Sequence, residues 1–422
     1  MVGERIRQLR IHKQLTQKEL TEGICSITYL SRIENGQINP SAEFLRKVSK
    51  RLGYDLTELS SPNRDEKTLG IVENYKQNGE ITEEELSYLH IQTLELNSAK
   101  INLGIYGVLL KYYTLKGEIE QARSIYKLSK RFISGEMSVE LEEEYFYYFL
   151  ACGNFFYYLQ DFTLANHYYS KGEGLLKSTD DLDAARLYYN LSLVKQRIHT
   201  NTEVSLTYSK KAYEIFKRHS EKENIIIVLI TLGVQYRLNN NLDTSLESLK
   251  QASSLISHAE QDMYFRYTAM IKYNIGRIFS IKKDYQNAVD YYEKSIKINE
   301  AYSAEKETVH SLRRLVELYI ELKDWIQVER FLKRAIGISE KYQLKHDYFL
   351  LNLLKLSIKK LQGDDNLYEK GMQKMLESAI QTNQGFLIQQ ISRELGNHFY
   401  DKKAYKKAAD YFKKIYDLEM IE

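Results

Sequence analysis

Proline is almost absent from this sequence. Its two prolines are Pro40 and Pro62, and none occurs between residue 63 and the end of the chain at residue 422. Proline is excluded from helix interiors because it lacks an amide hydrogen and its ring clashes with the preceding turn. A proline-free stretch of this length predicts an array of long helices. The polar segment 61–66 is the expected linker between a domain at residues 1–60 and a larger one at residues 67–422.

Cysteine is equally scarce: Cys25 and Cys152 stand far apart, so neither a disulfide framework nor a cysteine metal site is expected. The charged N-terminus does not look like a signal peptide, and the most apolar run, 225–234, is about half as long as a membrane span. The nine histidines are scattered, and no nucleotide-binding loop or metalloprotease motif occurs. These absences predict a cytoplasmic protein that is not an enzyme, does not enter a membrane, and uses no metal or cofactor.

Positive charge, in contrast, is concentrated at the start of the chain. Residues 1–60 carry ten lysines and arginines against seven acidic residues, a balance of +3 that equals the formal net charge of the whole chain. The remaining residues therefore balance to zero. A small basic module of this kind is typical of a protein that binds a polyanion.

The same segment predicts five short helices. Thr16 and Glu19 form a capping box at the start of one helix, and Ser26 caps the next, which ends at the turn 35–36. A fourth helix follows Ser41, and a short fifth one covers residues 56–59. Two short helices joined by a glycine-containing turn, the second of them polar at its start, indicate a helix-turn-helix.

The stretch LTQKEL…SITYLSRIENGQINPS resembles the Xre and phage-repressor class of DNA-binding domains. The resemblance implies that residues 26–34 form a recognition helix whose start enters the major groove of double-stranded DNA. Base contacts are then expected from Gln17, Ile27, Thr28 and Arg32, and phosphate contacts, which position the domain, from Arg10, Lys13, Tyr29 and Ser31. The alternative is that Ile27 belongs to the core and that Arg32 is an ordinary solvated charge.

The rest of the chain repeats a pattern of glycine, an aromatic residue, a small residue, and an aromatic residue or leucine. One copy is Gly276, Phe279, Ala288 and Tyr292; further copies begin at Gly153, Gly233 and Gly396. We expect the glycine and the small residue to face each other, so that two antiparallel helices approach closely. The copies resemble tetratricopeptide repeats. They predict about nine helix pairs that form a right-handed superhelix, with pairs starting near residues 65, 103, 146, 186, 226, 269, 309, 350 and 389.

Such a superhelix has a concave surface, lined by the first helix of each pair. By position, the side chains expected there are Lys111, Asn154, Asn190, Arg197, Arg237, Tyr273, Asn274, Arg277, Arg313 and Asn397. Asparagine is a poor helix former, but it can both donate to and accept from an extended peptide backbone. Arginine can bind a carboxylate. The alternative is that these are ordinary solvated residues.

An Xre-type domain followed by a divergent tetratricopeptide array resembles the RRNPP family of peptide-pheromone-responsive regulators. The resemblance implies a quorum-sensing transcription regulator that binds promoter DNA under the control of a short signalling peptide in the concave groove. It also implies Asn154, Asn190 and Asn397 as clamps on the peptide backbone, with Asn274 as a further candidate. Because one such domain reads only half of a two-fold operator, a homodimer or a higher oligomer is expected.

Two other functions stay open. The repeat domain could act as the Rap branch of that family does, binding a response regulator of the sporulation phosphorelay and lowering its phosphorylation. Gln92 lies in the first helix pair and is the glutamine considered for that role, although no motif supports it. A pure scaffold is the third reading, and the DNA-binding domain argues against it.

Overall fold

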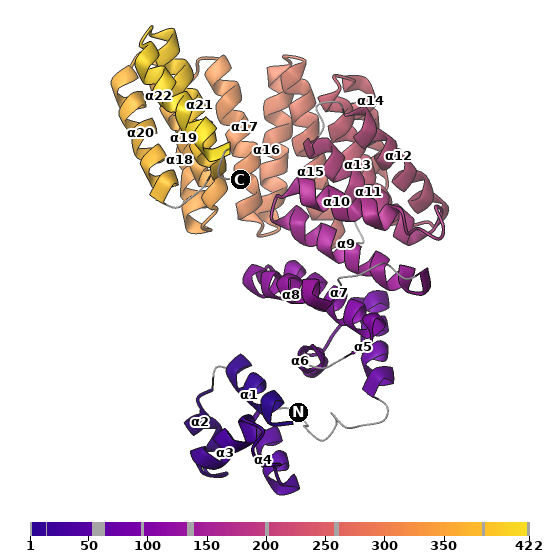
Figure 1. The fold of residues 1–422 in the computed structure, drawn as a ribbon. Helices are drawn as coiled ribbons and strands as arrows, with labels where there is room; N and C mark the ends of the chain where they lie inside the picture. Colours follow the sequence, from indigo (N-terminus) through magenta and orange to yellow (C-terminus); the bar gives the residue numbers. More distant parts are fainter. Residues whose placement is uncertain are drawn as a thin grey trace. The chain divides into compact units, whose positions relative to one another are not determined.

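The structure is a computed structural model that describes residues 2–13, 15–52, 64–93, 97–132, 139–198, 202–256, 261–381 and 385–419. Every regular element in these ranges is a helix (Figure 1), which confirms the predicted all-α class. The chain divides into two compact units, residues 1–224 and residues 225–422. The boundary falls inside one helix, α13 (Lys222–Leu238), rather than at the basic N-terminal segment.

Four of the five predicted N-terminal helices lie in the described residues. They are α1 (Val2–His12), α2 (Gln17–Thr21), α3 (Ile27–Glu34) and α4 (Ala42–Leu52). The expected fifth helix at 56–59 lies outside the described residues. Their apolar side chains form one cluster, which includes the fully buried residues Ile6, Leu20, Leu30, Ile33, Val48 and Leu52. Ile91 of α6 (Glu83–Gln92) joins this cluster at 3% exposure, so the core of the helix-turn-helix continues into the first helix pair of the repeats.

The predicted caps are present at both helices of the helix-turn-helix. The Thr16 side chain accepts from the Glu19 amide at 3.2 Å, and the Glu19 carboxylate accepts from the Thr16 amide at 2.7 Å. The Ser26 hydroxyl accepts from the Tyr29 amide at 3.2 Å and starts α3. A Cβ atom at Gly3 would overlap the Ile33 carbonyl, so only glycine lets α1 cross α3 this closely.

Nine consecutive helix pairs follow in the described part of the chain, the number predicted from the repeats. Their first helices are α5 (Arg64–Asn78), α7 (Ala99–Lys116), α9 (Glu142–Tyr158), α11 (Leu182–Ile198), α13, α15 (Gln261–Ile281), α17 (Thr308–Glu321), α19 (Lys345–Leu361) and α21 (Gly385–Asp401). Their second helices are α6, α8 (Ile119–Phe132), α10 (Phe162–Glu173), α12 (Glu203–Arg218), α14 (Leu242–Ser254), α16 (Tyr285–Ala301), α18 (Trp325–Lys341), α20 (Asp365–Gln381) and α22 (Tyr405–Glu419). Two short 3-10 turns, η2 (Val139–Leu141) and η3 (Glu305–Glu307), precede α9 and α17.

The predicted end of the linker, at residue 66, falls inside a helix. Helix α5 begins at Arg64, so residues 64–66 form its first turn. Residues 61–63, with Pro62, lie outside the described residues. Proline is tolerated just before a helix, which is why a boundary placed on Pro62 extended a few residues too far.

The repeat glycines make room for a large side chain of the second helix. A Cβ atom at Gly276 would lie 2.8 Å from the ring of Tyr292, and one at Gly233 would lie 2.8 Å from Leu249. Gly396 meets Phe412 in the same way, at 2.5 Å. The small residue of the repeat also lies close in one copy, where the Ser245 hydroxyl donates to the Gly233 carbonyl at 2.6 Å. The nearest contact of each of these glycines is nevertheless the large side chain one turn beyond the small residue, which fits into a notch, the space that a Cβ of the glycine would fill.

The turns within the helix pairs need neither glycine nor proline at most positions. Each of five places a non-glycine residue at a positive φ between 58° and 61°: Gln160, Asn240, Lys283, Lys323 and Lys403. An aspartate often follows and caps the next helix; Asp284 accepts from the Asn287 amide at 3.3 Å, and Asp324 from the Gln327 amide at 3.2 Å. Polar loop residues thus end one helix and start the next.

Candidate functional site

The exposed face of α3 carries the residues expected to contact bases. Ile27 is 45% exposed, although it is apolar, and Thr28 and Arg32 are also exposed. The core side of the same helix is formed by Leu30 and Ile33, which are fully buried. Ile27 is therefore not a core residue, which leaves its side chain, the Thr28 methyl and the Arg32 guanidinium on one solvent-facing surface.

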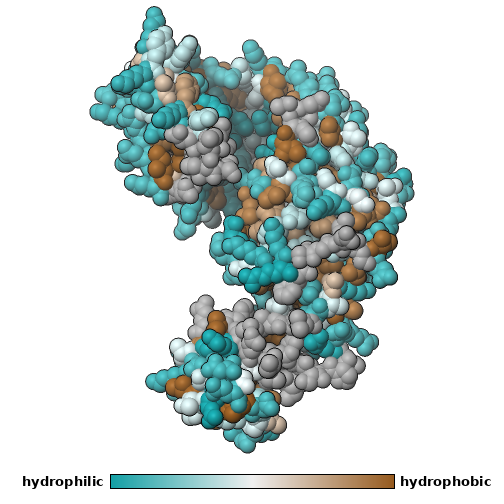
Figure 2. Space-filling model, in the orientation of Figure 1, coloured by the Kyte–Doolittle hydropathy of each residue, from teal (hydrophilic) through white to brown (hydrophobic). Residues whose placement is uncertain are grey.

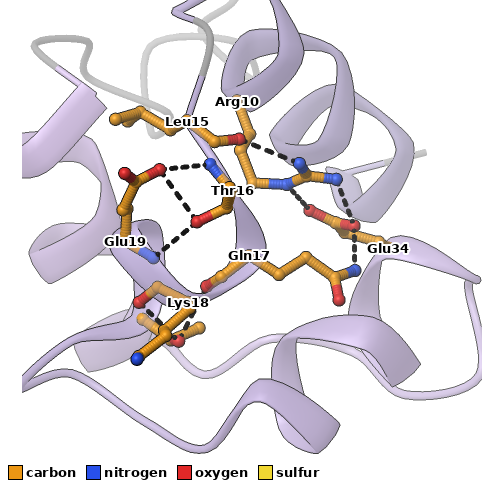
Figure 3. Close-up of polar contacts among 8 residues, drawn as sticks. Arg10, Leu15, Thr16, Gln17, Lys18, Glu19 and Glu34 are labelled. Atoms are coloured by element: carbon orange, nitrogen blue, oxygen red, sulfur yellow. Dashed lines mark hydrogen bonds and ion pairs between the residues drawn. The ribbon is translucent and has the colours of Figure 1, made fainter.

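A buried polar network holds α3 against α1 and α2 (Figure 3). Arg10 donates from Nε and Nη2 to the two carboxylate oxygens of Glu34, at 2.7 and 3.0 Å, and from Nη1 to the Leu15 carbonyl at 3.0 Å. Gln17 donates to the same carboxylate at 2.7 Å. The Glu34 side chain is only 2% exposed, so its charge is neutralised inside the domain.

This network includes two of the side chains that were predicted to contact DNA, Arg10 and Gln17. All three guanidinium nitrogens of Arg10 and the amide nitrogen of Gln17 already have partners within the domain. Both side chains therefore orient the recognition helix, whatever further contact they make. Tyr29 is half-buried, with its ring edge-on to Phe44 at a centroid distance of 5.3 Å, and Lys13 is exposed at the end of α1.

In the first unit, two of the expected peptide clamps are in contact. Asn190 of α11 donates from Nδ2 to Oδ1 of Asn154 of α9 at 3.2 Å, and the Tyr169 hydroxyl donates to the same oxygen at 2.7 Å. The two side chains therefore lie together as one linked group. Among the contacts of the described residues, the amide nitrogen of Asn154 and the carbonyl of Asn190 have no partner, and together they offer one donor and one acceptor.

Lys111 lies on the same unit, over two tyrosine rings. Its ammonium is 5.5 Å from the ring centre of Tyr75 and 5.4 Å from that of Tyr147. Burial, and then the charge of Arg186, lower the pKa of Lys111 below its usual value. The Tyr147 hydroxyl is buried and has no hydrogen-bond partner in the described structure. Arg197, the fourth residue expected here, is exposed and lies 5.7 Å from the ring centre of Phe162.

In the second unit, arginines from three first helices act on one another. Arg237 of α13 is only 6% exposed, and its Nε has no partner among the described residues. Burial, and then the charge of Arg277 of α15, lower the pKa of Arg237 to about 10, with a smaller effect from Arg314 of α17. The guanidinium is nevertheless protonated at neutral pH. The Arg314 Nε donates to the hydroxyl of Tyr273 at 3.4 Å.

A hollow of about 210 Å³ adjoins these arginines. Its apolar wall comes from Leu350, Leu353, Leu354 and Met372, and its polar rim from Arg313, Glu317, Ser357, Gln390 and Glu394. Glu317 forms an ion pair with Arg314 and lies 3.7 Å from Arg313, so it connects the hollow to the arginine group. The hollow has the mixed lining of a site for an apolar side chain with polar neighbours.

Two expected residues differ from the rest of the set. Asn274 is 7% exposed and donates to the Met270 carbonyl of its own helix at 2.9 Å, so its amide nitrogen already has a partner. Asn397 is exposed and lies two turns along α21 from Gln390, on the stripe that rims the hollow. The sequence missed Arg314, Glu317 and the apolar wall. Arg314 follows Arg277 by about one repeat, a spacing that would have identified it.

The described residues contain no helix that is both long and apolar enough to cross a membrane. Within those same residues, no three histidine, cysteine or acidic side chains group as metal ligands would. On the face seen in Figure 2, apolar side chains form small groups among hydrophilic ones. Gln92, the glutamine considered for a Rap-like activity, is fully buried and its side-chain amide has no partner in the described structure.

The helices and the two surfaces define a class of protein: a helix-turn-helix domain joined to a tetratricopeptide array. Residues 6–59 match the helix-turn-helix family, and residues 267–341 match the tetratricopeptide repeat family. The chain is 25% identical over 334 residues to the transcriptional activator NprA of Geobacillus stearothermophilus, which covers 77% of each chain.

Solved structures share the fold. The crystal structure of NprR in complex with its cognate peptide NprX covers 85% of this chain and 99% of that one, with a TM-score of 0.57 at 18% identity. A Rap protein complexed with competence and sporulation factor covers 85% and 96%, with a TM-score of 0.55 at 14% identity. The chain thus resembles the RRNPP regulators in domain composition and in fold, as its sequence predicted.

Proposed function

We propose that this protein is a peptide-controlled transcription regulator that acts in the cytoplasm. Its N-terminal domain binds duplex DNA through α3, and its repeat array binds a short signalling peptide through the first helices of the pairs. The observation that carries the proposal is the exposed row of Ile27, Thr28 and Arg32 on a helix that a buried ion pair fixes in place. The similarity to NprA, a transcriptional activator, supports it.

Different side chains are suited to the two roles, DNA binding and peptide binding. Arg32 can donate both guanidinium nitrogens to guanine O6 and N7, and the methyl groups of Ile27 and Thr28 can contact thymine. On the repeats, Asn154 and Asn190 offer the donor and acceptor that a buried peptide group requires. The solved complex of NprR with NprX, which has the same fold, supports a peptide as the ligand.

Selection of random duplex DNA by the full chain tests the first role. We expect a two-fold symmetric site to be enriched, and Arg32→Ala to lose about 1–3 kcal/mol of binding free energy and the preference at one base pair. Lys47→Ala is the matched control, because Lys47 is an exposed cation of the same domain that is paired with Glu43. No enriched sequence, or equal effects of both changes, would argue against the proposed readout.

The same proposal requires at least a dimer, because a single domain contacts half of a two-fold site. Helix α22 carries exposed aromatic residues, Tyr405 at 57% and Tyr416 at 59%, that suit a protein contact. Sedimentation of the full chain with selected DNA should give two chains per duplex. One chain per duplex at saturation would exclude the symmetric arrangement.

Binding of a response regulator, as the resemblance to the Rap branch implies, is the second candidate, favoured by the fold shared with a Rap protein. The structure gives Gln92 no part in it, since that side chain is fully buried. We therefore propose binding without catalysis: the chain is a regulator and not an enzyme. Incubation with a phosphorylated response regulator should leave its rate of dephosphorylation unchanged, and a rate increase that persists in Gln92→Ala would place a catalytic group elsewhere.

A further inference from the structure

The most unusual charge in the second unit is that of Arg237. A cation that is 94% buried is ordinarily paired with a carboxylate, because moving an unpaired charge out of water is costly. Among the residues that the structure describes, no carboxylate is paired with Arg237, and its Nε has no partner of any kind. The fold therefore keeps a donor group that its own side chains do not satisfy.

The neighbours of Arg237 add further positive charge around it. Arg277 and Arg314 both act on it electrostatically, and each comes from the first helix of a later pair. Arg277 is half-buried and forms no ion pair within the described ranges. Three guanidinium groups from three successive pairs thus lie near one another. A cluster of like charges with a perturbed pKa is typical of a functional site.

The acidic side chains beside these arginines are too few to neutralise their positive charge. Glu317 is the carboxylate beside them, and it is already shared by Arg314 and Arg313. Glu394 adds a second carboxylate on the rim of the adjoining hollow, and four arginines against two glutamates still leave a surplus of positive charge. Tyr273 adds a further donor, because its hydroxyl oxygen accepts from Arg314 while its own hydrogen stays available.

The hollow described above continues the same surface. Arg313 and Glu317 form part of its polar rim, and Leu350, Leu354 and Met372 belong to its apolar wall. A ligand that places a carboxylate on the arginines would therefore place its neighbouring group against that apolar wall. This arrangement selects for two features in one ligand: a negative charge and an apolar side chain beside it.

We propose that Arg237, Arg277 and Arg314, with Tyr273, form a carboxylate-binding subsite, and that the adjoining hollow takes an apolar side chain of the same short peptide. The inference rests on the proposed peptide-binding function and adds the chemistry of the ligand. The planar forks of the arginines suit the two oxygens of a carboxylate. The carboxylate is either an acidic side chain or the C-terminal carboxyl group of the peptide.

A structural role is the competing explanation of Arg237. A buried arginine that stabilises its own fold has its nitrogens bonded to carbonyls or carboxylates. Arg10 in the first unit is such a residue, with three bonded nitrogens. Arg237 differs from it in having an unpartnered Nε and two positive neighbours, the arrangement expected of a site that awaits an anion.

Peptide selection by the immobilised full chain tests the subsite. Two synthetic hexapeptide libraries of random sequence are used, one with free C-termini and one with amidated C-termini, and retained peptides are identified by mass spectrometry. Enrichment of aspartate or glutamate at one position in both libraries indicates a side-chain carboxylate. Retention from the free-acid library alone indicates the C-terminal carboxyl group. In either case leucine, isoleucine, valine or phenylalanine should be enriched beside the charge.

Variants of the full chain then test whether the arginines bind the carboxylate of the peptide. For a retained peptide, replacement of the carboxylate by an amide should weaken binding by at least about tenfold with the wild type, and by less than about twofold with Arg237→Gln or Arg277→Gln. Arg277→Gln, at a half-buried position, is the second variant in case Arg237→Gln does not fold. Arg330→Gln is the control, because Arg330 is exposed on a second helix, and it should behave as the wild type.

The outcomes separate the subsite from the function on which it rests. Retained peptides without an acidic preference and insensitive to amidation would overturn the subsite and leave peptide binding intact. A carboxylate effect that is equal in wild type and in both arginine variants would likewise overturn it. If the wild type retains no peptide from either library, the subsite and the proposed peptide function both fail.

Discussion

Arg10 and Glu34 form a two-pronged ion pair that joins α1 to the last turn of α3, with nitrogen–oxygen distances of 2.7 and 3.0 Å. The side chains are 12% and 2% exposed. Because the pair is buried and Gln17 binds the same carboxylate, it sets the angle at which α3 meets the rest of its domain. The exposed residues that we propose to read bases are therefore held in place by a contact on the opposite side of the same helix.

Loss of this carboxylate should loosen α3. Glu34→Ala leaves the Arg10 guanidinium buried and unpaired, and we expect the opening free energy of α3 to fall by about 3 kcal/mol. Hydrogen exchange of the α3 amides in the full chain measures it. Glu43→Ala is the control: its pair with Lys47 has side chains 67% and 48% exposed, and its loss should cost about 0.5 kcal/mol or less. Equal effects would show that the buried pair does not anchor α3.

The notches in the repeats predict opposite effects for two glycine-to-alanine changes in the second unit. At Gly276, the added Cβ would meet the Tyr292 ring at 2.8 Å, so Gly276→Ala should destabilise the unit by about 1–3 kcal/mol. At Gly337, on an exposed position of α18, the added Cβ would meet nothing within 4 Å. Gly337→Ala should stabilise by up to about 1 kcal/mol. Urea unfolding of both variants decides, and a loss at both positions would contradict the notch.

The asparagine pair predicts a non-additive effect on peptide binding. Asn190→Ala removes an acceptor and one of the two donors to the Asn154 carbonyl, and should weaken the affinity for a selected peptide by about tenfold, or ~1.4 kcal/mol. Asn154→Ala together with Asn190→Ala should cost much less than the sum of the single losses, because the two amides act as one unit.

Calorimetry with the wild type, the two single variants and the double variant gives the coupling free energy between Asn154 and Asn190 in peptide binding. Asn352→Ala is the control, because the Asn352 amide is bonded to the Tyr348 carbonyl of its own helix. DNA binding should be unchanged in all of these variants when no peptide is present. Strictly additive losses would show that the two asparagines contact separate parts of the ligand.

We predict that replacing Arg237 by an apolar residue stabilises the protein while it removes the proposed carboxylate binding. Arg237→Met removes a buried charge that is repelled by Arg277 and Arg314 and keeps most of the apolar volume. Without ligand, we expect the stability of the second unit to rise by about 1 kcal/mol or more, and its melting temperature by a few degrees. Arg330→Met, on the surface, should change stability by less than about 0.5 kcal/mol. A lower melting temperature for Arg237→Met would show that the guanidinium stabilises the fold.

Much of this protein was determined by local sequence. We predicted an all-helical chain with a helix-turn-helix and nine helix pairs from the absence of proline, the caps at Thr16 and Ser26, and the periodic glycines. Most of the predicted pair starts lie within a few residues of those in the structure; α9, for example, begins at Glu142 where 146 was expected. Helix α15 is the exception, beginning at Gln261 where 269 was expected. These features depend on a few neighbouring residues, which a linear pattern records directly.

What the tertiary structure alone decided is the set of partners that each side chain has across the pairs. That Gly276 lies against Tyr292, that Asn154 bonds Asn190, and that Arg237 keeps an unpartnered nitrogen beside two other arginines all depend on helix rotation and on the angle between helices. A rotation of one residue position, 100° in a helix of 3.6 residues per turn, moves a side chain from the core to the groove. The sequence marked which residues could face a ligand, and packing between repeats decided which of them already have partners within the fold.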